Sequence, residues 1–147
     1  MKFRKAVFIV TYIKDKDKIL YLLLKRKLHW KGWEFPKGGT EKPEHILGTV
    51  KRELKEETGQ SSRNIKSFKF SGKYKYPKLL ADRPGFIGQS YQIFSAEIKD
   101  KKVKIDKREH STCKWVNYKQ ALKLLAWPNQ RKCLSIVNSY INKRDKI

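Results

Sequence analysis

Two apolar runs open the chain, residues 6–13 and 19–25, and a charged segment separates them. Both runs are rich in β-branched, aromatic and aliphatic residues. Strands joined by a short polar turn give this pattern, so it predicts a β-hairpin. Residues 32–39 predict a loop with one short extended piece, because Pro36 disfavours helical angles at the residue before it.

A helix is predicted from just after residues 43–44 to Gly59, since glycine suits the position that follows a helix end. Its apolar stripe, at spacings of three and four, consists of Leu47, Val50 and Leu54. Gly48 lies inside this helix at a cost of up to ~1 kcal/mol relative to alanine. Close approach of its backbone to a sheet is the expected compensation.

Strands and two further helices are predicted in the second half of the chain. The predicted strands are residues 65–76, 89–98 and 113–116. Between the first two lies a basic, turn-rich loop, residues 77–88. Asn117 and Gln120 resemble a capping box that opens a helix, and Pro128 fits the first turn of a last one. The order predicts one α/β (α+β) domain over residues 1–147, with a mixed sheet and helices on its faces.

The net positive charge of the chain indicates which classes of molecule it could bind. The chain has 36 Lys+Arg against 14 Asp+Glu, a formal net charge of +22. Such an excess favours nucleic acid, nucleotides or anionic membrane surfaces. A lysine-rich proteome is the alternative explanation, because the lysines spread from Lys2 to Lys146 rather than forming one tail.

The number of cysteines and the hydropathy of the chain indicate the cellular compartment in which the protein resides. Cys113 and Cys133 are too few for a disulfide framework and have no close metal spacing, which favours a reducing cytoplasm. No run approaches the roughly 18 apolar residues that a membrane span needs. We therefore expect a cytoplasmic protein without a membrane partner.

Three carboxylates share one face of the predicted helix. Glu53, Glu56 and Glu57 stand at i, i+3 and i+4. Like charges at this spacing repel, and a divalent cation relieves the repulsion. Mg²⁺ prefers a few carboxylates, retained waters and substrate phosphate oxygens. Arg52 is placed to pair with one acid and fix its rotamer.

The loop before this helix adds to the same chemistry. Gly38-Gly39 lets the backbone come close to a ligand or metal, and Lys37 supplies a charge for phosphate. Metal-bound water is easier to deprotonate, and phosphoryl charge is neutralised as it develops. For the acids alone, the alternative is an exposed helix in which Lys51 and Lys55 pair with neighbouring glutamates.

The pattern Gly38-x5-Glu44-x7-Arg52-Glu53-Leu54-x-Glu56-Glu57-x-Gly59 resembles the signature of the Nudix hydrolase family. One position departs from it: Gln60 replaces the usual bulky aliphatic residue, which touches helix-end packing rather than chemistry. The resemblance implies an α/β/α sandwich and an enzyme that hydrolyses a nucleoside diphosphate linked to another moiety, with Mg²⁺ or Mn²⁺. It also implies that Arg52 orients Glu53 and that Gly38 offers its carbonyl to a metal. The implied metal ligands in the helix are Glu53, Glu56 and Glu57.

The flanks of this motif indicate the substrate class. Residues 33–39 resemble the segment before the motif in diadenosine tetraphosphate hydrolases and bacterial RNA pyrophosphohydrolases. Residues 74–78 and 87–94 are similar to the RNA enzymes and to plant-type tetraphosphatases. Glu109-His110, with Trp115 following, resembles a stretch of animal-type tetraphosphatases. That likeness implies that Glu109 is a fourth carboxylate at the metals or the base.

The flanks also make sense as substrate contacts. Lysines neutralise a polyphosphate, and a tyrosine that stacks a base contributes ~1–3 kcal/mol. The candidate substrate-binding residues are Trp33, Lys37, Tyr74, Lys75, Tyr76, Lys78 and Gln89. Ordinary strand packing for the tyrosines and a polar strand face for the glutamine remain alternatives.

Three functions follow from these residues. The first is a metal-dependent pyrophosphohydrolase acting on nucleoside polyphosphates such as diadenosine tetraphosphate. The second keeps the chemistry but takes the 5′-triphosphate end of RNA as substrate. The third is a non-catalytic RNA-binding module that retains the motif, against which the intact acids and Arg52 argue.

Overall fold

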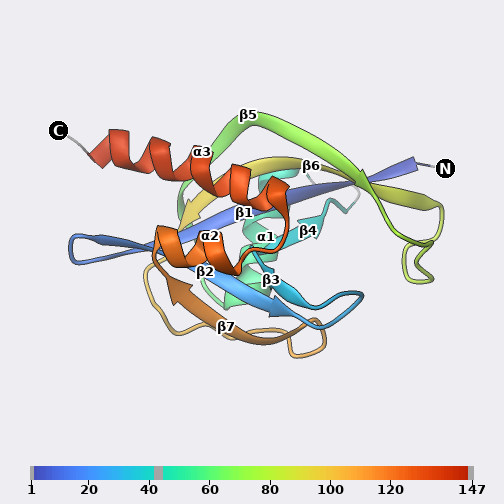
Figure 1. Ribbon diagram of the computed structural model, residues 1–147, viewed down its shortest axis with the longest axis horizontal. Helices are drawn as coiled ribbons and strands as arrows, with labels where there is room; N and C mark the ends of the chain where they lie inside the picture. Colours follow the sequence, from blue (N-terminus) through green and yellow to red (C-terminus); the bar gives the residue numbers. More distant parts are fainter. Residues whose placement is uncertain (1, 42–44, 146–147) are drawn as a thin grey trace.

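The computed structural model describes residues 2–41 and 45–145. Its strands are β1 (Lys2–Asp15), β2 (Lys18–Arg26), β3 (Gly32–Glu34), β4 (Lys37–Gly39), β5 (Arg63–Lys75), β6 (Phe86–Glu97) and β7 (His110–Val116). Its helices are α1 (Ile46–Thr58), α2 (Tyr118–Leu124) and α3 (Pro128–Asp145). Figure 1 shows the strands gathered between α1 and the pair α2–α3.

The strands form one mixed sheet in the order β3-β2-β1-β6-β5, with β4 paired to β1 and β7 paired to β2. β1 and β6 run parallel, and the other pairs are antiparallel. At the end of β1, Tyr12 lies opposite Tyr21 of β2. The predicted hairpin is therefore confirmed, and so is the mixed character of the sheet.

β1 lies at the centre of the molecule, and its side chains alternate between two cores. Phe8, Val10 and Tyr12 pack in the core that α2 and α3 cover, whereas Val7 and Ile9 pack in the core beneath α1. A strand covered on both faces needs a continuous apolar run, and its period of two sends alternate residues to opposite faces. The α/β/α layering is confirmed (Figure 1).

Helix α1 ends where the sequence predicts. Gly59 adopts φ 76°, which favours glycine, and its N–H bonds to the Lys55 carbonyl at 2.8 Å. Val50 and Leu54 are fully buried as expected. Leu47 is 45% exposed, so its assignment to the apolar stripe is wrong. The buried positions of α1 all lie from residue 49 onward, which leaves the first turn uncovered.

The expected contact at Gly48 is also absent. A Cβ built on Gly48 meets no described atom within 4 Å. Among the described residues, nothing therefore requires a glycine at this position.

The later elements agree with the prediction, with shifted boundaries. The capping box of α2 is present, with the Asn117 side chain accepting from the Gln120 N–H at 2.9 Å. β6 begins at Phe86 rather than at residue 89, and β7 at His110 rather than at residue 113, because their pairing with β1 and β2 extends that far. Within the described ranges, no helix combines the length and apolar character needed to cross a membrane.

Candidate active site

The three predicted metal-binding acids in the last turns of α1 differ in solvent exposure. Glu53 and Glu57 lie one turn apart and are buried, at 9% and 4% exposure. The Glu56 side chain is 58% exposed on the solvent side of the same turn. Two carboxylates therefore face the protein interior together, and the third lies beside them at the surface.

Arg52 connects these acids to the sheet. Its Nη1 donates to Glu53 Oε1 at 2.9 Å and to Glu56 Oε2 at 3.2 Å, while Nη2 donates to the Gly39 carbonyl at 2.9 Å. A guanidinium held by a strand carbonyl fixes the rotamer of the carboxylate it contacts. These contacts are the geometry expected of an arginine that orients Glu53.

Gly38 leaves the room that Glu53 occupies. A Cβ at position 38 would lie 2.0 Å from Glu53 Cδ and 2.1 Å from its Oε1. No larger residue fits beside the present position of that carboxylate. The approach of a ligand or metal to this glycine, and the role of its carbonyl toward a metal, remain predictions.

The two buried acids are held in a setting that disfavours their charge. Burial raises the pKa of Glu53 to about 7, against the opposing effect of Arg52 and with a further rise from Glu56. Burial also raises the pKa of Glu57 well above its usual range, and the carboxylates of Glu53, Glu34 and Glu109 add to that rise. Crowded carboxylates with raised pKa values are a setting that a divalent cation stabilises.

A second segment meets the end of α1. Glu57, Glu109 and His110 each place one ligand atom within 4.8 Å of the others. His110 is 1% exposed, whereas the side chain of Glu109 is 37% exposed and lies 3.9 Å from Arg26. The structure thus brings Glu109, predicted from sequence, together with Glu57, which lies more than fifty residues earlier in the chain.

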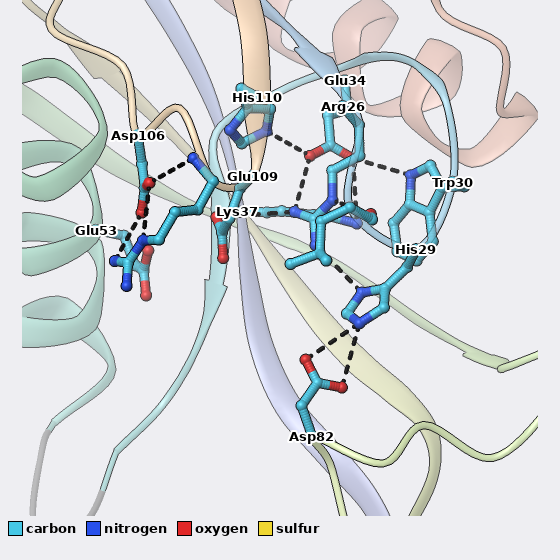
Figure 2. A network of polar contacts seen from close by, with 12 residues as sticks. Arg26, His29, Trp30, Glu34, Lys37, Glu53, Asp82, Asp106, Glu109 and His110 are labelled. Carbon is cyan, nitrogen blue, oxygen red and sulfur yellow. Dashed lines mark hydrogen bonds and ion pairs between the residues drawn. The ribbon is translucent and has the colours of Figure 1, made fainter.

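A buried carboxylate that the sequence analysis missed, Glu34, organises this region. His110 Nε2 lies 2.9 Å from Glu34 Oε2, Arg26 Nη1 donates to the same oxygen at 3.3 Å, and Trp30 Nε1 donates to Oε1 at 3.2 Å (Figure 2). Burial alone would raise the pKa of Glu34. Lys37, His110 and Arg26 outweigh burial and lower this pKa to about 2. The available signal was a carboxylate between two aromatic residues in an extended piece.

Lys37 joins this network to a cavity. Its Nζ lies 3.4 Å from Glu34 Oε1 and 4.1 Å from the centre of the Trp30 ring. Burial lowers the pKa of Lys37 to about 8, with Glu34 opposing the shift. A buried ammonium at a cavity wall is suited to bind a phosphate oxygen.

The cavity has a volume of about 610 Å³, within the ~300–1,000 Å³ typical of small-molecule sites. Its wall is mostly apolar and aromatic and includes three lysines. The lining residues are Phe8, His29, Trp30, Lys37, Tyr74, Lys75, Tyr76, Pro77, Lys78, Leu80, Trp127, Pro128, Asn129 and Gln130. Such a wall suits the flat apolar faces of a nucleobase.

Most predicted substrate-binding residues fall on this wall. Tyr74, Lys75, Tyr76 and Lys78 all line it. Gln89 does not; it is 2% exposed, and its side-chain oxygen accepts a hydrogen bond from the Tyr74 hydroxyl. Its place in the structure is therefore behind the wall, where it fixes a lining tyrosine.

The tryptophans differ from expectation. Trp30, not Trp33, lines the cavity. The Trp33 ring instead lies 5.9 Å from Lys25 Nζ and 5.2 Å from Lys114 Nζ. Trp33 lies within β3, whereas Trp30 lies in the bend before it. Trp33, predicted to bind substrate, is therefore not among the residues that line this cavity, whereas Trp127, which is 45% exposed, lines it.

A row of lysines and aromatic rings leads away from the cavity between β5 and α3. We call it the β5–α3 seam, consisting of Lys66, Phe68, Phe70, Lys132 and Tyr140. Lys66 Nζ lies 5.2 Å from the Tyr140 ring, and Lys132 Nζ lies 4.9 Å from the Phe70 ring. In the part of the chain that the structure describes, neither ammonium has an acidic partner.

The donor set near the end of α1 fits a divalent cation. Two atoms in it, Glu57 Oε2 and His110 Nδ1, are buried and have no hydrogen-bond partner among residues 2–41 and 45–145. Native proteins leave few such atoms without an explanation. Glu44, the other acid of the sequence motif, lies outside the described residues.

Comparison with known families agrees with this geometry. A NUDIX domain model matches residues 2–135. An RNA pyrophosphohydrolase of Haemophilus ducreyi is 33% identical over 89 residues, 56% of this chain and 45% of that protein. One of Pseudoalteromonas translucida is 35% identical over 97 residues, 58% of this chain and 56% of that protein. The matched region spans about half the length of these curated relatives.

Solved structures show the same fold. A Listeria monocytogenes protein assigned as a NUDIX hydrolase superposes with a TM-score of 0.80 at 24% identity, over 99% of this chain and 97% of that one. A Caenorhabditis elegans Ap4A hydrolase in a binary complex superposes with a TM-score of 0.75 at 22% identity, over 95% and 98%.

Proposed function

The chain belongs to the NUDIX family, and from that premise we propose that it is a metal-dependent pyrophosphohydrolase of nucleoside 5′-polyphosphates. One observation carries the proposal: the buried Glu57 of α1 has a ligand atom within 4.8 Å of one on His110, and His110 and the buried Lys37 both contact Glu34 beside an aromatic cavity. In the reaction, water attacks a phosphorus atom and the bridging P–O bond breaks. The attacked phosphoryl group gains the water oxygen, the leaving phosphate keeps the bridging oxygen, and the proton of the water passes to a carboxylate or to solvent.

The residues that would hold Mg²⁺ or Mn²⁺ are Glu53 and Glu57 from α1 and Glu109 from the turn before β7. Glu56 is the third helix carboxylate available, held at the surface by Arg52. When bound, the ion neutralises phosphate charge and makes a coordinated water easier to deprotonate. The remaining steps fall to this chain's own side chains.

Each side chain around the site has a separate role in binding or positioning. Arg52 holds Glu53 in one rotamer, so that the carboxylate does not swing away when substrate enters. Lys37 binds a phosphate oxygen from the cavity side. Trp30 and Tyr74 line the cavity in which a base would bind. Glu109, the more exposed carboxylate of the cluster, is open to the attacking water and the substrate phosphate.

The substrate that these features favour is the 5′-triphosphate end of an RNA. The base of the first nucleotide fits the cavity, and the β5–α3 seam starts beside it, because Pro128 at the start of α3 lines the cavity. Lysines without an acidic partner among the described residues, interleaved with aromatic rings, suit a single-stranded backbone. The partial matches to RNA pyrophosphohydrolases support the same substrate.

Dinucleoside polyphosphates are the second candidate. The observation in their favour is the placement of Glu109 and His110 at the end of α1, since this stretch resembles animal-type tetraphosphatases. A dinucleotide uses the cavity and Lys37 but makes no use of the β5–α3 seam. The two candidates therefore differ in whether these lysines contribute.

A direct comparison of kcat/KM tests the proposal. The substrates are a 5′-triphosphorylated oligoribonucleotide and diadenosine tetraphosphate, each with Mg²⁺ and with Mn²⁺. We expect the RNA to be preferred by at least ~10-fold, which corresponds to ~1.4 kcal/mol of transition-state stabilisation. The reverse preference would establish the dinucleotide as substrate.

The Glu57→Gln variant is the control for the assigned chemistry. It is expected to lower turnover by at least ~10²-fold, since it removes a charged metal ligand. If the wild-type protein hydrolyses neither substrate and still binds RNA tightly, the chain is a non-catalytic RNA-binding module.

A further inference from the structure

The cluster at the end of α1 contains a nitrogen donor beside its carboxylates. Glu57, Glu109 and His110 each contribute one ligand atom within 4.8 Å of the others. Glu57 lies in the last turn of α1, Glu109 lies in the turn before β7 and His110 is the first residue of β7, so two segments of the fold meet here. Three donors converging from two segments are enough for half of a metal coordination sphere.

Two atoms of this cluster are unsatisfied. Glu57 Oε2 and His110 Nδ1 are shielded from solvent, and neither finds a hydrogen-bond partner in the described part of the chain. Leaving a buried polar atom unpaired is unfavourable, because the atom gives up its hydrogen bonds to water and gains none in return. A hydrogen bond between His110 and Glu34 explains the burial of one ring nitrogen but leaves the other without a function.

The contact with Glu34 determines which nitrogen is free. His110 Nε2 is 2.9 Å from Glu34 Oε2, and Figure 2 shows the other ring nitrogen pointing away from Glu34. Arg26 and Lys37 keep Glu34 ionised, so its oxygen accepts and Nε2 carries the proton. In a neutral imidazole, Nδ1 then holds the lone pair. A carboxylate that fixes the tautomer of a metal-bound histidine is a recurring arrangement.

We propose that His110 is a metal ligand through Nδ1, in a site completed by Glu57 and Glu109, and that Glu34 is the residue that positions it. An imidazole nitrogen suits Mn²⁺, Co²⁺ and Zn²⁺ better than Mg²⁺, which prefers oxygen donors. The site therefore selects these three ions over Mg²⁺. The inference rests on the proposed function only for the use of the ion in hydrolysis, and metal binding itself is independent of substrate.

A spectroscopic measurement on the wild-type protein tests the ligand directly. Protein labelled with ¹⁵N-histidine is stripped of metal with a chelator and loaded with one equivalent of Mn²⁺. Electron spin echo spectra are expected to show coupling between Mn²⁺ and a histidine nitrogen. The chain has three histidines, so His45→Gln serves as the control that keeps the coupling, because His45 is exposed at the start of α1.

The His110→Gln variant distinguishes the role of Nδ1 from that of Nε2. The glutamine amide can still donate to Glu34 but supplies no counterpart of Nδ1. Calorimetric titration is expected to show a loss of at least ~10-fold in Mn²⁺ affinity and a smaller loss for Mg²⁺. Glu34→Gln is expected to weaken Mn²⁺ binding by ~10–100-fold while retaining the nitrogen coupling at saturating Mn²⁺.

Absence of nitrogen coupling in the Mn²⁺-loaded wild-type protein overturns the proposal, whether or not the variants fold. Equal affinities of wild type for Mn²⁺ and Mg²⁺ would also count against it. Coupling without hydrolysis of any nucleoside polyphosphate would leave the metal ligand assigned and reject the proposed enzymatic function instead.

Discussion

Arg52 donates from one guanidinium to Glu53, one residue along the helix, and to the carbonyl of Gly39 in β4, both at 2.9 Å. The two contacts lock the end of α1 to the sheet at the point where Gly38 leaves space for the carboxylate. Because the position of Glu53 depends on both contacts, substitutions at either Arg52 or Gly38 should disturb the same atom.

Replacing Arg52 with lysine should lower kcat by ~10–100-fold while leaving the free energy of unfolding nearly unchanged. Lysine keeps the charge but cannot span Glu53 and the Gly39 carbonyl with two parallel donors. Steady-state kinetics with saturating Mg²⁺, alongside urea unfolding, measure the two effects. Lys51→Gln, an exposed neighbour on the same helix, is the control expected to retain activity.

Replacing Gly38 with alanine should weaken metal binding, whereas the same change at Gly48 should not. In Gly38→Ala, the new Cβ falls 2.0 Å from Glu53 Cδ, so the carboxylate must move and divalent-metal affinity should fall by at least ~10-fold. The measurement is calorimetric titration with Mn²⁺. Unchanged affinity would show that Glu53 is not held where the metal needs it.

Gly48→Ala should stabilise the protein by ~0.5–1 kcal/mol and leave metal affinity unchanged. No described atom lies within 4 Å of the new Cβ, and alanine loses less backbone entropy in a helix interior. Urea unfolding of the wild type and the variant under identical conditions provides the value. A destabilised variant would mean that the first turns of α1 contact something the described residues do not include.

Acid should remove the stabilisation that Glu34 provides. Its folded pKa of about 2 lies below the ordinary value of 4.5. The contribution, ~3 kcal/mol, is therefore fully present above pH ~4.5 and is lost as the pH falls toward 2. Urea unfolding of metal-free protein from pH 2 to 7 measures it.

Glu34→Gln is the matched variant for this titration. It should unfold more easily at pH 7, because Arg26 and Lys37 lose their buried counter-charge. Its free energy of unfolding should also vary less than that of wild type between pH 4.5 and 2. Parallel pH profiles for the two proteins would contradict the assignment.

The β5–α3 seam should affect RNA and not a dinucleotide. In Lys66→Gln/Lys132→Gln, the slope of log(kcat/KM) against log[salt] for triphosphorylated RNA should become shallower by ~0.7 for each phosphate that the variant no longer neutralises. The same slope measured with diadenosine tetraphosphate should not change. Lys18→Gln/Lys51→Gln, which changes two exposed lysines outside the seam, removes the same number of charges and controls for total charge. Equal effects on both substrates would show that the β5–α3 seam does not contribute specifically to RNA recognition.

Local sequence patterns determined the elements and the metal-binding half of the site. The period of two in β1, the glycine at the end of α1 and the capping box at Asn117 act over a few residues, so their structures could be read directly from the chain. The spacing of Glu53 and Glu57 likewise fixed their common face. These features need no knowledge of what packs against them.

Only the tertiary structure decided which distant groups meet. Glu34, Arg26 and His110 form one buried network because β2 pairs with both β3 and β7, and neither pairing is encoded locally. Burial then sets their chemistry: the same carboxyl group is held ionised at Glu34 and resists ionisation at Glu57. The sequence supplied the donor types, and the fold determined which of them converge.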